Sequence, residues 1–248
     1  MDTKPERIIL LNIPLDIVTP ENLPLVIEKG LKQPQNRHIV LLSLWDLIRA
    51  RRNAEYRDYV LNAELVIPIS HSLVSGAKFL TGKKPVRYMP FNFIISLLSI
   101  LEKKEGSLFL LGSSVQVLRK AEKNIRTTFP GLNIVGRCDS KTCKKDEAPV
   151  VEAIRKASSN LLLTGKGVRG GELWIARNYD NLNSGFRLWC SDLFDILAEK
   201  RSRPSDAVFE RGLESIGFCM RNPFKLFRIF AFLYYNLLLL FYRLSGKN

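Results

Sequence analysis

Two short apolar segments that end in small residues are the parts of this chain best suited to act on a bound ligand. They are residues 108–114 and 161–167, and each apolar run is too short for a helix, which indicates a buried strand followed by a turn. Ligands bind outside the carboxyl ends of such strands, where small residues let a backbone or a ligand approach closely. The candidate ligand contacts are Gly112, Ser113, Gly165 and Gly167. The same glycines could instead serve only to form tight strand-to-helix turns.

Apolar runs alternate with stretches of helical length through most of the chain. This alternation predicts an α/β fold, with a parallel sheet covered by helices, over a core of residues 1–191. The predicted strands are residues 8–12, 38–44, 64–69, 107–112, 132–136, 160–165 and 185–190. The clearest helical stretches are residues 46–62, 91–104, 114–129 and 147–158.

The composition changes after about residue 192, which predicts a helical appendage over residues 192–248. Its last helical stretch, residues 223–244, is heavily apolar, but its charge-free part is shorter than the ~20 residues needed to span a bilayer. Aromatic residues along the stretch and basic residues at both ends favour a helix that lies on the membrane surface. Basic residues that could face phospholipid or a diphosphate are Arg203, Lys225 and Arg228. The alternative is a C-terminal helix that packs into the core of the protein.

The charge balance and the cysteines restrict the class of function. A net charge of +14 over 248 residues calls for an anionic partner, such as a phosphorylated substrate, an anionic membrane surface or nucleic acid. The last lacks any readable motif, so we expect no nucleic-acid partner. Four cysteines and two histidines without a metal-binding spacing predict free thiols in a reducing compartment and no metal site. The N-terminal residues do not form a secretory signal.

Three stretches, in order along the chain, resemble the WecG/TagA/CpsF glycosyltransferases. The first is residues 107–136, with Phe-Leu-Leu-Gly-Ser-Ser and later Phe-Pro-Gly-Leu-Asn-Ile-Val-Gly. The second is Gly-Lys-Gly at residues 165–167, followed by Glu-Leu-Trp-Ile-Ala-Arg-Asn at 172–178. The third, weaker, stretch begins at Phe194 and Asp195 and reaches Arg228. The resemblance covers residues 40–228.

This resemblance implies a specific reaction. The family has a Rossmann-like core and a helical appendage that docks on the inner face of the cell membrane from the cytoplasm. It transfers an amino sugar such as N-acetylmannosamine from a UDP-sugar to an undecaprenyl-diphosphate-linked acceptor in bacterial surface polysaccharide or glycolipid synthesis, with no metal or other cofactor. The reaction inverts the anomeric carbon, so a carboxylate should accept the proton of the acceptor hydroxyl. Cationic or N–H groups should stabilise the departing UDP. Homo-oligomerisation stays open.

The sequence departs from the family where the base is expected. Ile69 stands at the position of the base aspartate, and Leu42 and Leu44 replace a threonine and an asparagine of the family pattern. An aliphatic side chain cannot accept a proton. Two residues could substitute as the catalytic base, Asp195 and His71. Either could instead be an ordinary capping or surface residue.

The remaining family positions assign contacts with the sugar donor. Two classes of function stay open. Together with the glycines and Ser113 named above, Glu172 is expected to contact the donor or to order the loop after Gly167; a glutamate that only favours the helix dipole is the alternative. The first class is a divergent membrane-associated glycosyltransferase. The second is a catalytically inactive relative that acts as a binding or scaffolding subunit, which the loss at Ile69 favours.

Overall fold

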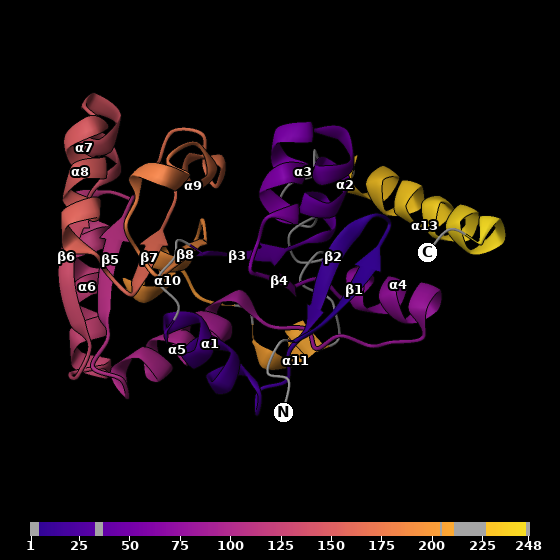
Figure 1. The fold of residues 1–248 in the computed structure, drawn as a ribbon, viewed down its shortest axis with the longest axis horizontal. Helices are drawn as coiled ribbons and strands as arrows, with labels where there is room; N and C mark the ends of the chain where they lie inside the picture. Colours follow the sequence, from indigo (N-terminus) through magenta and orange to yellow (C-terminus); the bar gives the residue numbers. More distant parts are fainter. Residues whose placement is uncertain (1–4, 33–36, 204, 211–226, 247–248) are drawn as a thin grey trace.

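The computed structural model describes residues 5–32, 37–203, 205–210 and 227–246, and it is an α/β fold (Figure 1). Six of its strands form a parallel sheet in the order β4-β3-β8-β7-β5-β6, and β1 and β2 form a separate antiparallel hairpin. The strands are β1 (Glu6–Leu10), β2 (Ile13–Ile17), β3 (Arg37–Leu42), β4 (Leu65–Pro68), β5 (Ser107–Leu111), β6 (Asn133–Cys138), β7 (Leu161–Thr164) and β8 (Phe186–Trp189). All seven strands predicted from the sequence are confirmed, and β2 was missed.

The missed strand β2 completes the hairpin through a two-residue turn. Leu11 and Asn12 both have positive φ, 52° and 67°, as a tight hairpin turn requires. Asp16 is buried in the middle of β2, where its carboxylate accepts from Arg7 at 2.7 Å and from the backbone N–H of Val66 at 2.7 Å. A buried carboxylate in an apolar strand is tolerated only with such partners, so Asp16 ties the hairpin to β4.

Helices cover both faces of the sheet. They are α1 (Leu23–Lys32), α2 (Leu44–Arg52), α3 (Ala54–Leu61), α4 (His71–Thr81), α5 (Pro90–Glu102), α6 (Val115–Thr128), α7 (Ser140–Lys145), α8 (Ala148–Ala157), α9 (Leu173–Arg177), α10 (Leu193–Leu197), α11 (Asp206–Glu210), α13 (Phe227–Ser245) and the 3₁₀ turn η1 (Tyr179–Asn181). The sequence predicts one helix over residues 46–62, and this is wrong. Asn53 has an extended backbone, and its side chain accepts from the N–H of Tyr56 at 2.7 Å, so it ends α2 and caps α3.

Two apolar clusters lie on opposite faces of the sheet. One contains the buried faces of α2, α3, α8 and α9, and the other contains those of α1, α5, α6 and α10. The chain leaves β5 toward β6 through α6 on one face, and it leaves β7 toward β8 through α9 on the other face. β5 and β7 are neighbours, and the chain leaves them in opposite directions along the sheet, on opposite faces. This is the topological switch point of the sheet, where ligands bind in open α/β folds.

The C-terminal helix α13 has two different faces. Its buried residues Tyr235, Leu239 and Tyr242 pack toward α4, α2 and the β1–β2 turn. Tyr235 donates from its hydroxyl to the carbonyl of Ser72 at 2.9 Å, and Asn12 donates to the hydroxyl of Tyr242 at 2.9 Å. The opposite face exposes large apolar residues: Phe230, Phe232, Leu233, Tyr234, Leu237, Leu240, Phe241 and Leu244.

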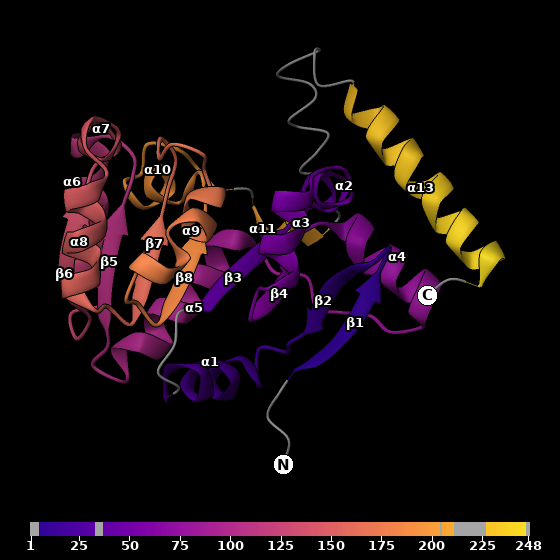
Figure 2. The same ribbon diagram turned by 45° about the horizontal axis from the view of Figure 1, so that its top comes forward.

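The sequence left two interpretations of the C-terminal segment, a helix on the membrane surface and a helix packed into the core, and each describes one face of α13. One face of α13 packs on the core, and the other exposes large apolar side chains. Among the described helices, none is both long and apolar enough to cross a membrane. Figure 2 shows α13 beside α4 at one end of the molecule, with α6 and β6 at the other end.

Candidate functional site at the switch point of the sheet

The loops after β5 and β7 meet at the switch point. The N–H of Gly165 donates to the carbonyl of Leu111 at 2.8 Å, and the N–H of Ser113 donates to the carbonyl of Lys166 at 2.7 Å. Gly112 also donates to the carbonyl of Cys138 at the end of β6, at 2.8 Å. The structure therefore brings the two small-residue segments into direct contact.

The glycines at this edge are required by the packing of the loops on one another. A Cβ on Gly112, whose φ is 112°, would lie 2.8 Å from the carbonyl oxygen of Gly165. A Cβ on Gly165 would lie 2.4 Å from the ring of Phe194, and one on Gly167 would lie 2.7 Å from Ser140. These contacts account for the glycines without a ligand. Their contact with a donor stays a prediction.

Ser113 connects this junction to the start of α6. Its backbone has φ 59°, a conformation uncommon outside glycine, and its hydroxyl is buried with no partner among the described residues. Its carbonyl accepts from the N–H of Ser140 at 2.9 Å and from its hydroxyl at 2.7 Å. Ser114 then caps α6, a helix of 14 residues whose amino end points to the switch point. The unpaired N–H groups and the dipole at such an end favour a bound anion.

A lysine and a carboxylate form an ion pair beside the same loops. Lys166 Nζ pairs with Oδ2 of Asp195, which lies in α10 directly after β8. The Asp195 side chain is buried, whereas that of Lys166 is 48% exposed. Oδ1 of Asp195 has no partner within the described ranges. The pair thus places a cation at the surface of the site and a carboxylate oxygen below it that can accept a proton or a hydrogen bond.

The three departures from the family pattern lie together at the ends of β3 and β4. The N–H of Ile69 donates to the carbonyl of Leu42 at 2.9 Å, and the N–H of Leu44 donates to the hydroxyl of Ser70 at 3.1 Å. Leu42 is fully buried, and Leu44 and Ile69 are half-buried. The positions that the resemblance assigns to polar groups therefore carry aliphatic side chains at the neighbouring ends of these two strands.

His71 and Asp195 are not brought together as an acid–base pair. His71 is the exposed first residue of α4, with Nδ1 3.3 Å from the hydroxyl of Ser75. It follows β4, whereas Asp195 follows β8, and β3 lies between these strands. Two strand spacings of about 4.8 Å each separate the two loops. The two residues could therefore act only as separate candidates for the base, and the catalytic role of each stays a prediction.

Glu172 joins the loop after β7 to the helices after β3. Its carboxylate pairs with the guanidinium of Arg49 in α2, which also lies 4.1 Å from the centre of the Tyr56 ring. A second ion pair, Arg177 to Glu55 at 2.9 Å, joins α9 to α3. The Arg49 contact fits the expected role of Glu172 in ordering this loop, and a contact with the donor stays a prediction.

The basic residues assigned to the membrane or to a diphosphate fall in three different situations. Arg203 donates to the side chain of Asn92 in α5 at 2.8 Å. Lys225 lies outside the described residues. Arg228 is in the first turn of α13, but its side chain is not described.

The reasoning from sequence missed Lys166 and Arg49. Lys166 stands between the two glycines of the Gly-Lys-Gly segment, and as the single cation of that segment it could have been chosen. Arg49 carries no signal of its own in the sequence, because its partner Glu172 is more than a hundred residues away.

The sequence of this chain is similar to those of known glycosyl transferases. Residues 8–248 match the glycosyl transferase WecG/TagA/CpsF family. An N-acetylglucosaminyldiphosphoundecaprenol N-acetyl-beta-D-mannosaminyltransferase of Bacillus spizizenii is 21% identical over 174 residues, which are 70% of this chain and 67% of the relative. A protein of the same name from Bacillus subtilis is 21% identical over 192 residues, 77% of this chain and 74% of the relative.

Proposed function

Because this chain belongs to the WecG/TagA/CpsF family of glycosyl transferases, we propose that it transfers an N-acetylhexosamine from a UDP-sugar to a polyprenyl-diphosphate-linked acceptor. The names of the two Bacillus relatives describe transfer of N-acetylmannosamine onto N-acetylglucosaminyldiphosphoundecaprenol. A similar amino sugar and a similar lipid-linked acceptor are proposed here, in the synthesis of a cell-surface polymer.

The observation that carries this proposal is the convergence of Ser113, Lys166 and Asp195 beside the amino end of α6, at the switch point of the sheet. A diphosphate at this end would meet the helix dipole and the ammonium of Lys166. Both groups would act on the negative charge that develops on UDP as the bond to the sugar breaks. Such fixed groups lower the barrier because they act most strongly in the transition state.

The proton of the acceptor hydroxyl needs a base. We assign this role to Asp195, since its Oδ2 is held by Lys166 and its buried Oδ1 has no partner among the described residues; Lys166 must move aside for the acceptor hydroxyl to reach it. The acceptor oxygen then attacks the anomeric carbon, the bond to the UDP oxygen breaks, and the proton moves to Asp195. His71 is the alternative base, on the separate loop after β4.

A second candidate function rests on the aliphatic residues Leu42, Leu44 and Ile69 at the ends of β3 and β4. If the reaction requires a carboxylate at position 69, this chain binds the donor without turning it over. It would then serve as a binding or scaffolding subunit.

The exposed face of α13 supports a place on the membrane surface. Eight large apolar side chains are left in water on this face, and burial of each in the interface would contribute about 2 kcal/mol. We propose that this face rests on the anionic inner leaflet of the cell membrane, which would bring the site near a lipid-linked acceptor.

The test separates donor binding from turnover. Calorimetry with UDP, UDP-N-acetylmannosamine and UDP-N-acetylglucosamine measures binding, and product formation on a lipid-linked acceptor measures turnover. Asp195→Asn should lower turnover about 100-fold and leave UDP binding within a few-fold. Asp192→Asn is the matched control, because Asp192 directly precedes α10, three residues before Asp195, and pairs with Arg201 at 2.7 Å.

Each other outcome points to a different conclusion. If His71→Ala lowers turnover and Asp195→Asn does not, the base is His71. If the wild type binds UDP without turnover and Ile69→Asp restores some, the scaffolding function is correct. If no UDP binds at millimolar concentration, both functions are wrong.

A further inference from the structure

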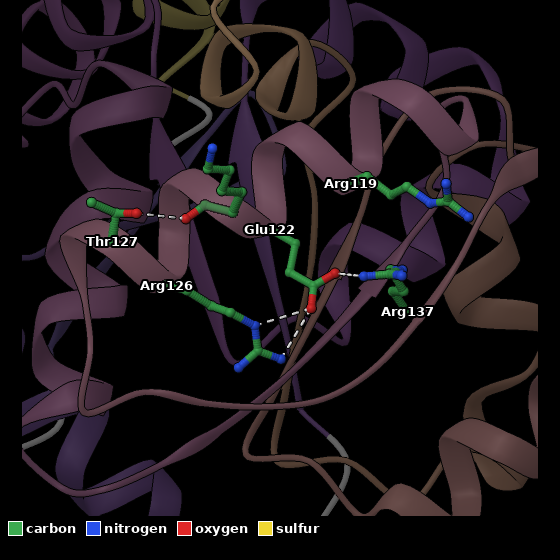
Figure 3. Close-up of a pocket in the computed structure, with 6 residues that line it drawn as sticks. Arg119, Glu122, Arg126, Thr127 and Arg137 are labelled. Atoms are coloured by element: carbon green, nitrogen blue, oxygen red, sulfur yellow. Dashed lines mark hydrogen bonds and ion pairs between the residues drawn. The ribbon is translucent and has the colours of Figure 1, made fainter.

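A basic groove lies between α6 and the edge strand β6, outside the switch point. It has a volume of about 360 Å³ and is open to solvent (Figure 3). The residues that line the groove are Arg119, Glu122, Lys123, Arg126, Thr127 and Arg137. Four of these six side chains are cationic and one is anionic, so the groove carries three positive charges that its own lining does not balance.

The cations of α6 form a stripe along the helix. Arg119, Lys123 and Arg126 recur at spacings of four and three residues, which places them on one face. At 1.5 Å per residue the stripe is about 10 Å long. A row of cations of this length suits a ligand with successive anionic groups better than a single small ion.

Glu122 holds two arginines of the groove, Arg126 of the stripe and Arg137 of β6. Arg126 donates from Nε and Nη2 to Oε1 of Glu122 at 3.1 and 3.0 Å, and Arg137 pairs with Oε2. The Glu122 side chain is largely buried, and Figure 3 shows it between the two guanidinium groups, with Arg119 on the Arg137 side. Each guanidinium has five N–H donors, so both keep donors for a ligand while Glu122 holds their orientation.

We propose that this groove binds a ligand that carries two or more linked phosphate groups. Arginine forks match phosphate oxygens in geometry, and arginines already held in place lose less conformational freedom on binding. Charged residues on an edge strand can also prevent pairing with another sheet. Arg137 alone would be enough to prevent such pairing. Protection of the edge strand therefore explains neither the buried Glu122 nor the stripe on α6.

The position of the groove separates it from the other two proposed surfaces. The stripe begins at Arg119, in the second turn of α6, and runs away from the switch point at the amino end of the helix. α6 and β6, which form the groove, lie at the opposite end of the molecule from α13 (Figures 1 and 2). Two sources supply this chemistry, a soluble polyphosphate and the phosphate groups of lipid headgroups.

The probe is inorganic tripolyphosphate, titrated by calorimetry into the full-length protein. A site at the switch point would bind the probe equally in the test and control variants, so the difference between the two variants reports the groove. The test variant is Arg119→Gln with Lys123→Gln, two residues that are not among those holding Glu122. The control is Lys120→Gln with Lys144→Gln, which removes equal charge from α6 and α7 outside the groove.

We expect the groove variant to raise the Kd for tripolyphosphate about tenfold or more, and the control variant to raise it no more than about twofold. Raised salt should weaken wild-type binding. The second arm measures sedimentation with phosphatidylglycerol vesicles. If the groove variant loses only vesicle binding relative to the control, the groove binds separate lipid phosphates and the proposal of a ligand with linked phosphates is wrong. If the two variants behave alike toward both probes, the groove is not a phosphate site.

Discussion

The contact between Gly76 of α4 and Tyr235 of α13 gives a direct test of how the C-terminal helix is held. A Cβ on Gly76 would lie 1.9 Å from the Tyr235 hydroxyl oxygen and 2.9 Å from Cζ. No real side chains approach this closely, so in Gly76→Ala the tyrosine ring must move. The movement would break the hydrogen bond from Tyr235 to the carbonyl of Ser72, which is 2.9 Å long.

Three contributions determine the size of the effect. Alanine in the middle of α4 should stabilise the helix by about 1 kcal/mol relative to glycine. Overpacking against the Tyr235 ring should cost about 2 kcal/mol. Loss of the buried hydrogen bond should cost about 1 kcal/mol more. The clash therefore outweighs the gain in helix propensity, and Gly76→Ala should lower the stability of α13 docking by about 2 kcal/mol.

A double-mutant cycle isolates the contact. Urea unfolding gives the free energy of unfolding, and hydrogen exchange of residues 227–245 reports the docking of α13. Tyr235→Leu alone should be destabilising, since it removes the hydroxyl and part of the buried ring. In the double variant Gly76→Ala with Tyr235→Leu, the added methyl should cost nothing further, because the shorter side chain leaves room for it.

The control is Lys78→Ala, an exposed change on the same helix, which should leave the exchange of α13 unaltered. If the costs of Gly76→Ala and Tyr235→Leu add within about 0.5 kcal/mol, the two residues do not touch and the docking described above is wrong.

Three other predictions follow from particular contacts. Burial lowers the pKa of His38 to about 4, so the unfolded chain, with a pKa near 6.5, takes up a proton first as the pH falls. The free energy of unfolding should therefore be highest above about pH 6.5 and fall by about 3 kcal/mol toward pH 4. In urea titrations of His38→Gln this fall should be absent. Leu237, Leu240 and Leu244 are exposed on α13, and their replacement by glutamine should abolish sedimentation with anionic vesicles without lowering the melting temperature. If sedimentation and the melting temperature both fall, these side chains belong to the core. Gly112→Val should weaken UDP binding in calorimetry because its side chain would displace the loop at Gly165, and unchanged binding would remove this loop from the donor site.

The strands could be predicted from sequence because each is a compact apolar run with small residues after it. β5 and β7 are buried on both faces, and both end in the glycines that their tight junction requires. β2 was missed because Pro14 and a buried Asp16 interrupt its apolar pattern. The turn of Leu11 and Asn12 was the signal available, since asparagine tolerates positive φ.

The composition of the site could be predicted only in part, because its contacts depend on the order of strands in space. Lys166 and Asp195 meet because β7 and β8 are neighbours, and Glu172 meets Arg49 because β8 is paired with β3 on its other side. Neither pairing has a local signature. The two faces of α13 likewise depend on what lies beside the helix, so a pattern of apolar residues alone could not separate the packed side from the exposed side.

The order of the strands also has a consequence for how the chain folds. β3 pairs with β4 early in the sequence, and β5 pairs with β6, but these two pairs are joined only when β7 and β8 enter between them. β5 can pair with β7 once residue 164 has been synthesised, but until residue 189 has been synthesised β3 and β7 present unpaired edges that can associate with other chains. The last strands to emerge from the ribosome are therefore the central ones, and folding of the sheet should be slow and cooperative because it waits for these distant contacts.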